Sequence, residues 1–441
     1  MKRKPGFIIV LLSLFSTAIL AQEERKLTLY EAIDLSLQNS KTLKSSQARI
    51  EEATAAYREA VEKKLPNASV TGSYLRLNSA NIDLKSSGNG GSSGGGSPKV
   101  SQALYGLLNV SLPVYAGGRI KYGIESSELL KKATELDADN NKEEVIQTTI
   151  EAYATLFKAG TAVKLVKENL GQSEQREKEL SGLEKNGLLA RNDLLKAQLQ
   201  SSNVELSLLD AQNNLELANL NMNLMLGLPA DTKLLLDTTG IARKDDERVL
   251  EDYLTAAKAN RKDLTALGYR KLAAESGEKA VKGEMYPSFQ VSGGYIAADV
   301  PKVLTVTNAM NIGIGVSYNI ASLWKTKSKV QQADAKVKQL AIAEDQMQDN
   351  IRLQVSKSYL SLMSNRKKIE VTGRALEQAT ENYRIVKNKF DNNLATLSDL
   401  LEADVAQLQA NMAHTLARAD AFVAYNKLLL SAGILSADLK N

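Results

Sequence analysis

The chain has 441 residues, no cysteine, and 56 basic against 51 acidic side chains, which give a formal net charge of +5. The lack of cysteine excludes disulfide bonds, metal sites built on thiolates and a lipid-modified N-terminal cysteine. Three of the basic residues, Lys2, Arg3 and Lys4, lie at the start of the chain. Without them the net charge falls to +2, which gives no electrostatic case for nucleic-acid binding.

Residues 1–21 have the pattern of a secretory signal peptide, with three basic residues, an apolar run from Phe7 to Leu20 and the small residue Ala21. A membrane anchor helix is the alternative, but this run is short for a span of about 20 residues. We therefore expect cleavage after Ala21 and export of the mature protein. No later apolar stretch reaches about 18 residues, so a membrane location would have to depend on strands.

The mature sequence contains one pattern twice. Asn39 and Leu43 recur 221 residues later as Asn260 and Leu264, and further along the chain the offset is 206 residues. The second offset holds without a gap over more than a hundred residues, so we interpret the chain as an internal duplication. It relates Val110, Ser111, Tyr153, Asn186, Leu188, Asp193, Leu194, Leu195 and Gly227 to Val316, Ser317, Tyr359, Asn392, Leu394, Asp399, Leu400, Leu401 and Gly433.

The two offsets differ by fifteen residues, which the first copy carries between Tyr74 and Val110. This interval includes the glycine- and serine-rich segment Ser86–Pro98. Its composition alone is typical of a flexible linker between domains. Because it lies inside a repeat, we interpret it instead as an enlarged loop that is exposed to solvent.

The first repeat, residues 22–228, is predicted to contain a helix, two strands and a helical hairpin. The helix covers Tyr30–Lys64 and stops before Pro66. The predicted elements that follow are strands over about 67–78 and 101–112, a long helix over about 120–185, a turn at about 186–190 and a returning helix that ends at Gly227.

The second repeat, residues 250–434, is predicted to have the same plan. A helix over Leu250–Gly283 precedes strands over about 287–298 and 308–320, a long helix that ends at Phe390, a turn at about 391–395 and a returning helix. Residues 229–249 between the repeats look like short mixed structure, and residues 435–441 form a C-terminal tail.

The clearest strand is Met310–Ile320, where large apolar side chains alternate with small or polar ones without a miss. Four such strands in one chain cannot close a membrane barrel, since barrels begin at eight strands and an open edge is costly in lipid. Several copies are therefore required, and three would supply twelve strands. Tyr115 and Trp324, at the strand-to-helix junctions, fit an aromatic girdle or ordinary packing at a turn equally well.

The last predicted helix carries a heptad seam. Leu401, Leu408, Thr415, Phe422 and Leu429 are seven residues apart, and Val405, Met412 and Ala419 follow the first three of these by four. The spacing suits packing against a neighbouring helix, although burial in an ordinary bundle would use the same residues.

Taken together, these features resemble the TolC-like outer membrane efflux proteins over the whole mature chain. The resemblance rests on the duplicated plan, on LPNASVTGSY and YPSFQVSGGY before the strands, and on VSLPVYAGGR before the first long helix. The turn motifs KNGLLARNDLLKAQ and DNNLATLSDLLEAD are the most specific part.

The resemblance implies a mainly α protein with a small β portion. Three copies would form a 12-stranded β-barrel in the outer membrane, continuous with a 12-helix α-barrel across the periplasm. It further implies that the helical turns dock a membrane-fusion adaptor and an inner-membrane pump of the RND or ABC type. The turn residues that match this adaptor contact are Asn186, Gly187, Leu188, Asn392, Asn393 and Leu394.

The resemblance also implies a gate at the periplasmic mouth. Asp399 and Glu402 match a ring of acidic side chains, Phe390 matches a common gate tyrosine, and Asp193 is the matching aspartate of the first repeat. Ala395 stands where some members have a gating arginine, which puts their ionic lock in doubt here. Asp399 and Glu402, three residues apart, share one helical face. Solvated surface charge is the alternative interpretation.

We find no catalytic, phosphate-binding or metal-binding motif, and we expect no enzyme and no cofactor. The single histidine, His414, is expected to lie on a helix surface. The main hypothesis is a passive exit duct for small molecules in a tripartite efflux system. The alternatives are a conduit for type I protein secretion, a non-transporting structural or adhesive trimeric stalk, and an ungated porin.

Overall fold

The computed structural model describes residues 24–81, 99–237, 248–301 and 303–438. The predicted signal peptide, the segment Ser86–Pro98, part of the inter-repeat segment and the end of the C-terminal tail lie outside the described residues. The described chain is mainly helical with a small β portion, as the sequence predicts. Among its helices, none combines the length and the apolar character needed to cross a membrane.

The chain folds into two compact units, and each unit contains segments of both repeats. Unit 1 comprises residues 1–40, 144–247 and 358–428, and unit 2 comprises residues 41–143, 248–357 and 429–441. The units cut across the repeats because two long helices, α3 (Arg119–Lys185) and α7 (Ser322–Asp391), each contribute residues to both.

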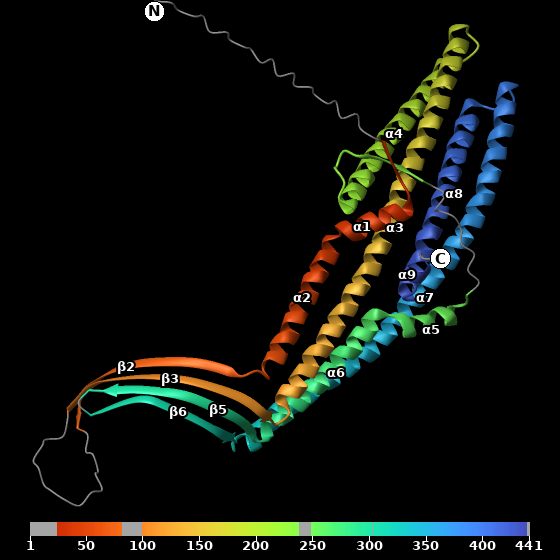
Figure 1. Ribbon diagram of the computed structural model, residues 1–441. Coiled ribbons are helices and arrows are strands. Elements are labelled where there is room, and N and C mark those ends of the chain that lie inside the picture. The colour runs from red at the N-terminus through yellow and green to blue at the C-terminus, as the bar shows by residue number, and fades with distance from the viewer. Residues whose placement is uncertain (1–23, 82–98, 238–247, 302, 439–441) are drawn as a thin grey trace, which may run out of the picture. The chain divides into compact units, whose positions relative to one another are not determined.

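Unit 2 contains a four-stranded antiparallel sheet (Figure 1). Its strands lie in the order β2 (Asn67–Asn81), β3 (Lys99–Ala116), β5 (Ser288–Val300) and β6 (Leu304–Ser317). The first two strands are longer than the sequence pattern indicates. The last ends at Ser317 rather than at Ile320, because its partner β5 begins at Ser288, directly opposite Ser317.

One face of this sheet is apolar on all four strands. Residues that pair across strands share a face, and the register places Val70 beside Leu108, Leu108 beside Tyr295, and Val291 beside Ile314. The exposed apolar side chains on this face are Val70, Tyr74, Leu104, Leu108, Val110, Leu112, Tyr115, Phe289, Val291, Met310, Ile312, Ile314 and Val316. We name this set the apolar sheet face.

The opposite face of the sheet is largely small or polar. Ser69, Ser111, Ser292 and Asn311 lie on it, although Tyr105, Leu107 and Ile296 are also exposed there. The predicted alternation is therefore clearest on β6 and is interrupted by Leu75 on β2, by Tyr105 and Leu107 on β3 and by Ile296 on β5. Such a sheet is suited to an apolar medium on one side and to water on the other.

The junction between β3 and α3 requires glycine. Gly117 and Gly118 have φ angles of +65° and +83°. A Cβ added at Gly117 would lie 2.1 Å from the carbonyl oxygen of Gly283, so no side chain fits at this close approach of two backbones. Gly283 opens the 3-10 turn η2 (Gly283–Met285), which leads into β5.

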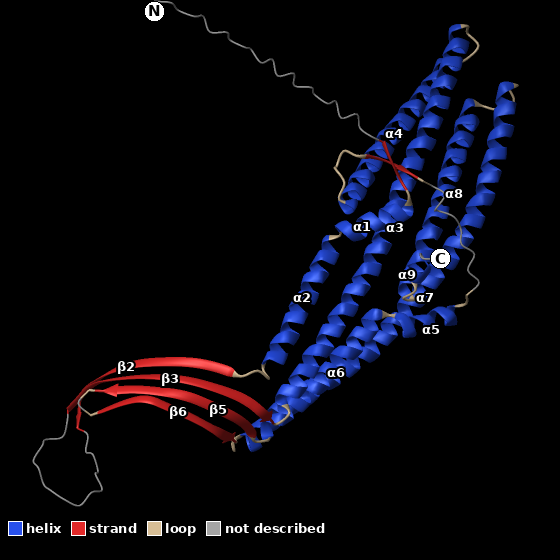
Figure 2. Cartoon of the chain, in the orientation of Figure 1, coloured by secondary structure: helices blue, strands red, loops and turns tan. Residues whose placement is uncertain are grey.

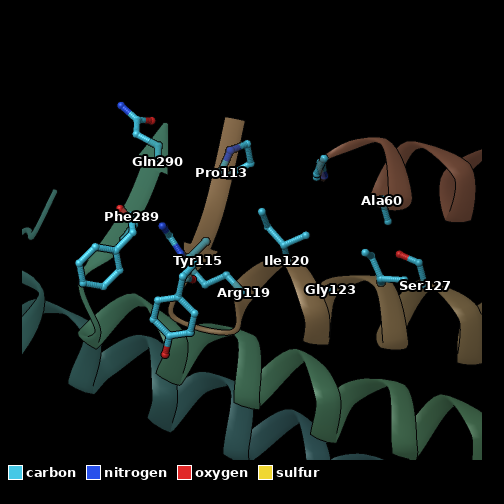
Figure 3. A pocket seen from close by; sticks show the side chains of 13 residues that line it. Ala60, Pro113, Tyr115, Arg119, Ile120, Gly123, Ser127, Phe289 and Gln290 are labelled. Carbon is cyan, nitrogen blue, oxygen red and sulfur yellow. Dashed lines mark hydrogen bonds between the residues drawn. The ribbon is translucent and has the colours of Figure 1, made fainter. Parts of the chain in front are cut away.

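Aromatic rings flank the same junction. The ring centroids of Tyr115 and Phe289 are 6.1 Å apart. Figure 3 shows these side chains, from β3 and β5, beside Arg119 and Ile120 at the start of α3. They border a cavity of about 530 Å³ that also involves the end of α2 (Lys41–Glu62). The placement fits both of the interpretations given above for Tyr115.

Two predicted helices are each broken in the structure. The helix predicted over 30–64 corresponds to α1 (Leu29–Asn39) and α2, with a break at Ser40. The helix predicted over 250–283 corresponds to α5 (Leu250–Asn260) and α6 (Lys262–Lys282), with a break at Arg261. The two breaks are 221 residues apart and are therefore equivalent positions of the duplication.

The breaks coincide with the C-terminal caps of other helices. Asn39 Nδ2 donates a 2.8 Å hydrogen bond to Leu226 O at the end of α4 (Arg191–Leu226), next to Gly227 with φ +72°. In unit 2, a Cβ on Gly433 would come within 3.0 Å of the carbonyl carbon of Asn260. This shared packing explains why both asparagines and both glycines recur in the sequence.

Unit 1 contains two helical hairpins, which Figure 2 shows in blue. The first consists of the later part of α3 with α4, and the second of the later part of α7 with most of α8 (Leu397–Ser431). A short parallel pair, β1 (Glu24–Leu27) with β4 (Lys233–Leu236), completes the unit, and α9 (Leu435–Asp438) ends the described chain in unit 2.

The hydroxyl of Tyr153 in α3 forms hydrogen bonds at the ends of β1 and β4. Its buried hydroxyl lies 2.6 Å from Asp237 O and 3.0 Å from Leu27 O. Burial, with the nearby charge of Asp237, raises the pKa of Tyr153 to about 12. The phenol is therefore neutral and available as a donor at physiological pH.

Candidate gate at the two helical turns

The turn between α3 and α4 is a Schellman motif. Leu188 N donates to Leu183 O at 2.9 Å, and Gly187 N donates to Glu184 O at 2.9 Å. Gly187 has a φ of +75°, which a glycine adopts without steric cost. The Asn-Gly pair in the sequence thus ends one helix and reverses the chain.

The turn between α7 and α8 repeats this geometry with a different residue. Leu394 N donates to Lys389 O at 2.7 Å, and Asn393 N donates to Phe390 O at 2.9 Å. Asn393 takes the position of Gly187 with a φ of +60°, which asparagine tolerates better than most residues. Both turns therefore have the same backbone hydrogen bonds, as their offset of 206 residues predicts.

The residues predicted to contact an adaptor lie at the surface of unit 1. Asn186, Gly187, Asn392 and Asn393 are all exposed. Leu188 and Leu394 are 74% and 76% exposed. A single exposed leucine is unremarkable, but these two occupy equivalent positions of the two turns.

An apolar cluster beneath the turns joins the two hairpins. Its buried members are Leu180, Leu194, Ala197, Leu397 and Leu400, from α3, α4 and α8. Phe390, predicted as a gate residue, packs against this cluster together with Tyr383 and Val386 of α7. Its ring therefore contributes to the packing between the hairpins.

Asp399, also predicted as a gate residue, forms a capping box with Thr396. Its Oδ2 accepts hydrogen bonds from the Thr396 hydroxyl at 2.7 Å and from Thr396 N at 2.9 Å, and Asp399 N donates to Thr396 Oγ1 at 3.2 Å. The hydroxyl bond, followed by the backbone bond, lowers the pKa of Asp399 below its ordinary value. The carboxylate is exposed, and Thr396 fixes its orientation.

Asp193 and Glu402 complete the predicted gate set. Asp193, half-buried in the first turn of α4, binds Lys196 Nζ at 3.2 Å, and the same amino group lies 3.4 Å from Ser398 Oγ of α8. Glu402 is exposed one turn beyond Asp399. The Lys196 contact links the start of α4 to the first turn of α8, next to Asp399.

A buried ion pair, which the sequence analysis did not predict, lies deeper between the hairpins. Arg176 of α3 donates to Asp404 of α8 at 3.0 Å and to the hydroxyl of Tyr383 of α7 at 3.2 Å. The side chains of Arg176 and Asp404 are only 11% and 2% exposed. Asn169 Nδ2 supplies a longer contact to Asp404, at 3.4 Å.

Electrostatics favours the charged form of this arginine. Burial alone lowers the pKa of Arg176, but the hydrogen bond and the charge of Asp404 outweigh it and raise the pKa above the ordinary value. The guanidinium of Arg176 therefore stays charged, and its contact with Asp404 links the first hairpin to the second. Its partners are 228 residues apart in the sequence, so helix periodicity could not have paired them.

Comparisons with known proteins match both repeats. A family model described as outer membrane efflux protein matches residues 32–228 and 253–433. The outer membrane efflux protein BepC of Brucella suis is 22% identical over 442 residues, which cover 97% of this chain and 90% of that protein.

Solved structures support the same fold. The outer membrane channel CmeC of Campylobacter jejuni superposes with a TM-score of 0.77 at 17% identity, covering 93% of this chain and 88% of that one. The outer membrane protein VceC of Vibrio cholerae gives a TM-score of 0.75 at 18% identity, covering 92% of this chain and 96% of that one.

Proposed function

The chain belongs to the outer membrane efflux protein family, and we propose that copies of it form a passive exit duct that carries small molecules from the periplasm to the exterior. The single observation that carries this proposal is the family match over both repeats, residues 32–228 and 253–433. Family membership places the protein in the bacterial outer membrane. The cargo class, the assembly and the partners are part of the proposal.

The apolar sheet face supports a membrane-embedded assembly. Val70, Ile312 and Ile314 are 80%, 86% and 80% exposed in the single chain. Burying such side chains in lipid is favourable by about 25 cal/mol per Å² of apolar surface. A sheet with open edges is unstable there, because each unpaired amide costs free energy. Three chains would provide twelve strands and remove every edge.

The proposed partners follow from the resemblance. A homotrimer would dock a periplasmic membrane-fusion adaptor at the exposed turns, with Leu188 and Leu394 as apolar contacts. An inner-membrane pump of the RND or ABC type would supply the driving force, and the duct itself would remain passive.

We further propose that the ends of the hairpins form the gate. In a trimer, each gate residue would recur three times around the axis: Asp193, Phe390, Asp399 and Glu402. A ring of carboxylates selects permeating ions by charge. The ion pair of Arg176 with Asp404 supports this proposal, because it links the first hairpin to the second. This chain has Ala395 where some members of the family have a gating arginine, so another arginine is needed for such a link.

Deletion of the gene in its own bacterium tests the exit function. We expect intracellular accumulation of a fluorescent dye to rise and susceptibility to toxic compounds to increase, with both effects reversed by the plasmid-borne gene. Unchanged accumulation together with the loss of one exported protein from the medium would indicate type I secretion instead. No change in either would favour the structural stalk.

Single-channel recording in planar bilayers tests the gate. Asp399→Ala with Glu402→Ala is expected to raise conductance and to lower cation selectivity. Thr396→Ala, which keeps both carboxylates, serves as the control for helix capping. Conductance and selectivity equal to those of the wild type would remove Asp399 and Glu402 from the gate.

A further inference from the structure

The cavity beside the start of α3, shown in Figure 3, combines an apolar wall with two cationic side chains. Tyr115 and Phe289, which belong to the apolar sheet face, line it together with Ile120 of α3. Arg119, the first residue of α3, and Lys63, directly after α2, supply the positive charge. None of the described residues that line the cavity is acidic. Its volume of about 530 Å³ is typical of a site for a small molecule.

This cavity lies where the apolar sheet face ends. The pairing of β3 with β5 stops at Ala116 and Ser288, one residue beyond Tyr115 and Phe289. Helix α3 begins three residues later at Arg119, and none of the described helices has the length and hydropathy of a membrane span. With the apolar sheet face in lipid, the cavity is therefore at the level of the lipid head groups, where aromatic rings are favoured.

Both cations are available to an anionic ligand. Arg119 Nε donates to Ala116 O at 3.1 Å, and among the described residues the terminal nitrogens Nη1 and Nη2 have no hydrogen-bond partner. Lys63 Nζ lies 3.6 Å from Glu59 Oε1, but these side chains are 63% and 73% exposed, so water screens the pair. A guanidinium can bind two oxygens of one phosphate, and an ammonium adds a compact positive charge.

The second repeat has an ion pair at the equivalent positions. The offset of 221 residues converts Lys63 into Glu284, and the offset of 206 converts Gly123, which also lines the cavity, into Lys329. Lys329 Nζ lies 2.7 Å from Glu284 Oε2. In the first repeat, a Cβ added to Gly123 would meet no atom within 4 Å. The first repeat therefore has open space and a basic residue where the second has a complete ion pair.

We propose that this cavity binds the phosphate group of an anionic glycerophospholipid from the periplasmic leaflet of the outer membrane. The terminal nitrogens of Arg119 bind two phosphate oxygens, and Lys63 supplies a second positive charge. The acyl chains leave the cavity past Tyr115 and Phe289 and lie along the apolar sheet face. The inference rests on the proposed function, because it requires that face to lie in lipid, and it adds one lipid site to each copy of the chain.

The apolar wall favours a lipid over free phosphate as the ligand. Tyr115 and Phe289 are 45% and 39% exposed in the single chain, and an inorganic phosphate would leave both rings in water. An acyl chain covers them, and removing apolar surface from water is favourable. The positive charge in turn favours an anionic head group over a zwitterionic one, whose own ammonium would lie near Arg119 and Lys63.

Native mass spectrometry of the detergent-solubilised protein tests the site, with phosphatidylglycerol as the anionic probe and phosphatidylcholine as the zwitterionic one. We expect phosphatidylglycerol to bind several-fold more tightly than phosphatidylcholine. A basic side chain near lipid contributes about fivefold in affinity, so Arg119→Gln with Lys63→Gln should weaken phosphatidylglycerol binding by more than about tenfold. Equal affinities of the wild type for the two lipids would overturn the proposal.

Two single variants separate the cavity from the general attraction of basic residues to anionic lipid. Gly123→Leu keeps both cations but fills the open space beside α3, so it should weaken phosphatidylglycerol binding several-fold. Lys325→Gln removes the exposed cation that corresponds to Arg119 in the second repeat, and it should leave binding nearly unchanged. Thermal unfolding without added lipid verifies the fold of each variant. A loss with Lys325→Gln as large as that with Arg119→Gln would show attraction without a site and would overturn the proposal.

Inorganic phosphate distinguishes the two sources of a phosphate group. Added in excess, it should not displace phosphatidylglycerol, and displacement would assign the cavity to soluble phosphate instead of lipid. The same spectra separate this inference from the proposed function, because the cavity lies within one chain. A mass of three chains without a preference for phosphatidylglycerol would refute the lipid site and leave the trimeric duct. A mass of one chain would refute the assembly, and the lipid preference of that single chain and its variants would still decide the site.

Discussion

The first hairpin, α3 with α4, and the second, α7 with α8, have the same backbone plan but use their equivalent side chains differently. Both turns are Schellman motifs, with Gly187 in one and Asn393 in the other. Asp193 and Asp399 are equivalent by the offset of 206 residues and lie in the first turns of α4 and α8.

One residue separates the roles of these two aspartates. The hydroxyl of Thr396 donates a hydrogen bond to Asp399. The equivalent residue before α4 is Ala190, which is the N-cap of that helix and has no side-chain hydrogen bond to offer. Asp193 consequently pairs with Lys196. The comparison shows that the duplicated backbone fixes where a carboxylate lies, and that its neighbours decide what it binds.

The buried charge differs even more between the repeats. Asp404 corresponds to Gln198, and Tyr383 corresponds to Glu177. Gln198 donates to Glu177 at 3.2 Å inside the first hairpin, whereas Asp404 accepts from Arg176 of the other hairpin. Of the two equivalent positions, Asp404 therefore makes a buried charged contact with the other hairpin, whereas Gln198 contacts its own hairpin.

Asp404→Asn is the substitution with the largest expected effect on this comparison. It keeps the shape of the side chain but leaves the charge of Arg176 buried without its partner, which typically costs about 3 kcal/mol of unfolding free energy. Denaturant unfolding of the detergent-solubilised protein measures the loss. Gln198→Asp serves as the matched substitution at the equivalent, half-buried position, where we expect a smaller loss.

A double variant distinguishes charge from packing at the same site. Arg176→Met with Asp404→Leu removes both charges and keeps apolar volume, so it should recover most of the stability lost in Asp404→Asn. A loss as large as that of the single variant would mean that packing geometry matters more than the unpaired charge.

Tyr153→Phe should have the next largest effect. It removes the hydroxyl that lies between Leu27 O and Asp237 O, with an expected loss of about 1 kcal/mol. The folded-state pKa of Tyr153, about 12, is above the ordinary tyrosine value of 10.0. The phenol therefore contributes stability that is fully present below pH 10 and is lost as the pH rises towards 12.

Thermal unfolding between pH 9 and about 12 measures this contribution. The wild type should lose stability over the upper part of the range, and Tyr153→Phe should lose less. Tyr359→Phe removes the equivalent hydroxyl of the second repeat. This control variant should lose stability at high pH as the wild type does, because Tyr153 is unchanged. Parallel curves for the wild type and Tyr153→Phe would contradict the assignment.

A reciprocal exchange at the helix caps tests the role of Thr396. Thr396→Ala removes the capping hydroxyl of α8, and Ala190→Thr offers one to Asp193 in α4. An N-cap side chain is worth about 1 kcal/mol, so amide exchange in the first turn of α8 should become about fivefold faster. Exchange in the first turn of α4 should become slower.

The pH dependence of stability provides a second test of the contact between Thr396 and Asp399. Because the pKa of Asp399 is lowered in the folded state, its contribution is present above the unfolded value, 3.8, and disappears as the pH falls through the folded value. The difference in thermal stability between the wild type and Thr396→Ala should therefore shrink at strongly acidic pH. A difference that is constant with pH would show that the carboxylate takes no part in the cap.

The sequence was sufficient for the features that depend on local periodicity. Alternation from Met310 onward reflects the two faces of one strand, and the recurring Asn39 and Asn260 reflect one packing arrangement used twice. Breaks at Ser40 and Arg261 were missed because neither residue breaks a helix by its own propensity. The breaks depend on the ends of other helices that dock beside them.

The places of Asp193 and Asp399 in the secondary structure were predictable, whereas their contacts were not, and their role in a gate stays a prediction. The turn motifs located Asp193 and Asp399 correctly at the helix starts. The contact of Lys196 with Ser398 and that of Arg176 with Asp404 depend on how the hairpins pack, and a single sequence contains no signal for that packing.

The smallest expected effect concerns Lys196, which corresponds to Glu402 in the second repeat. Lys196 and Asp193 are 50% and 29% exposed, and such surface pairs contribute at most about 1 kcal/mol. Lys196→Ala should therefore hardly change unfolding. Lys196→Glu places a second carboxylate beside Asp193 after the α3–α4 turn, as Glu402 lies beside Asp399 after the α7–α8 turn. Under the proposed gate, this substitution should increase cation selectivity, measured as the reversal potential across a KCl gradient. An unchanged reversal potential would mean that the first turn lies away from the conducting path, even though its backbone repeats that of the second.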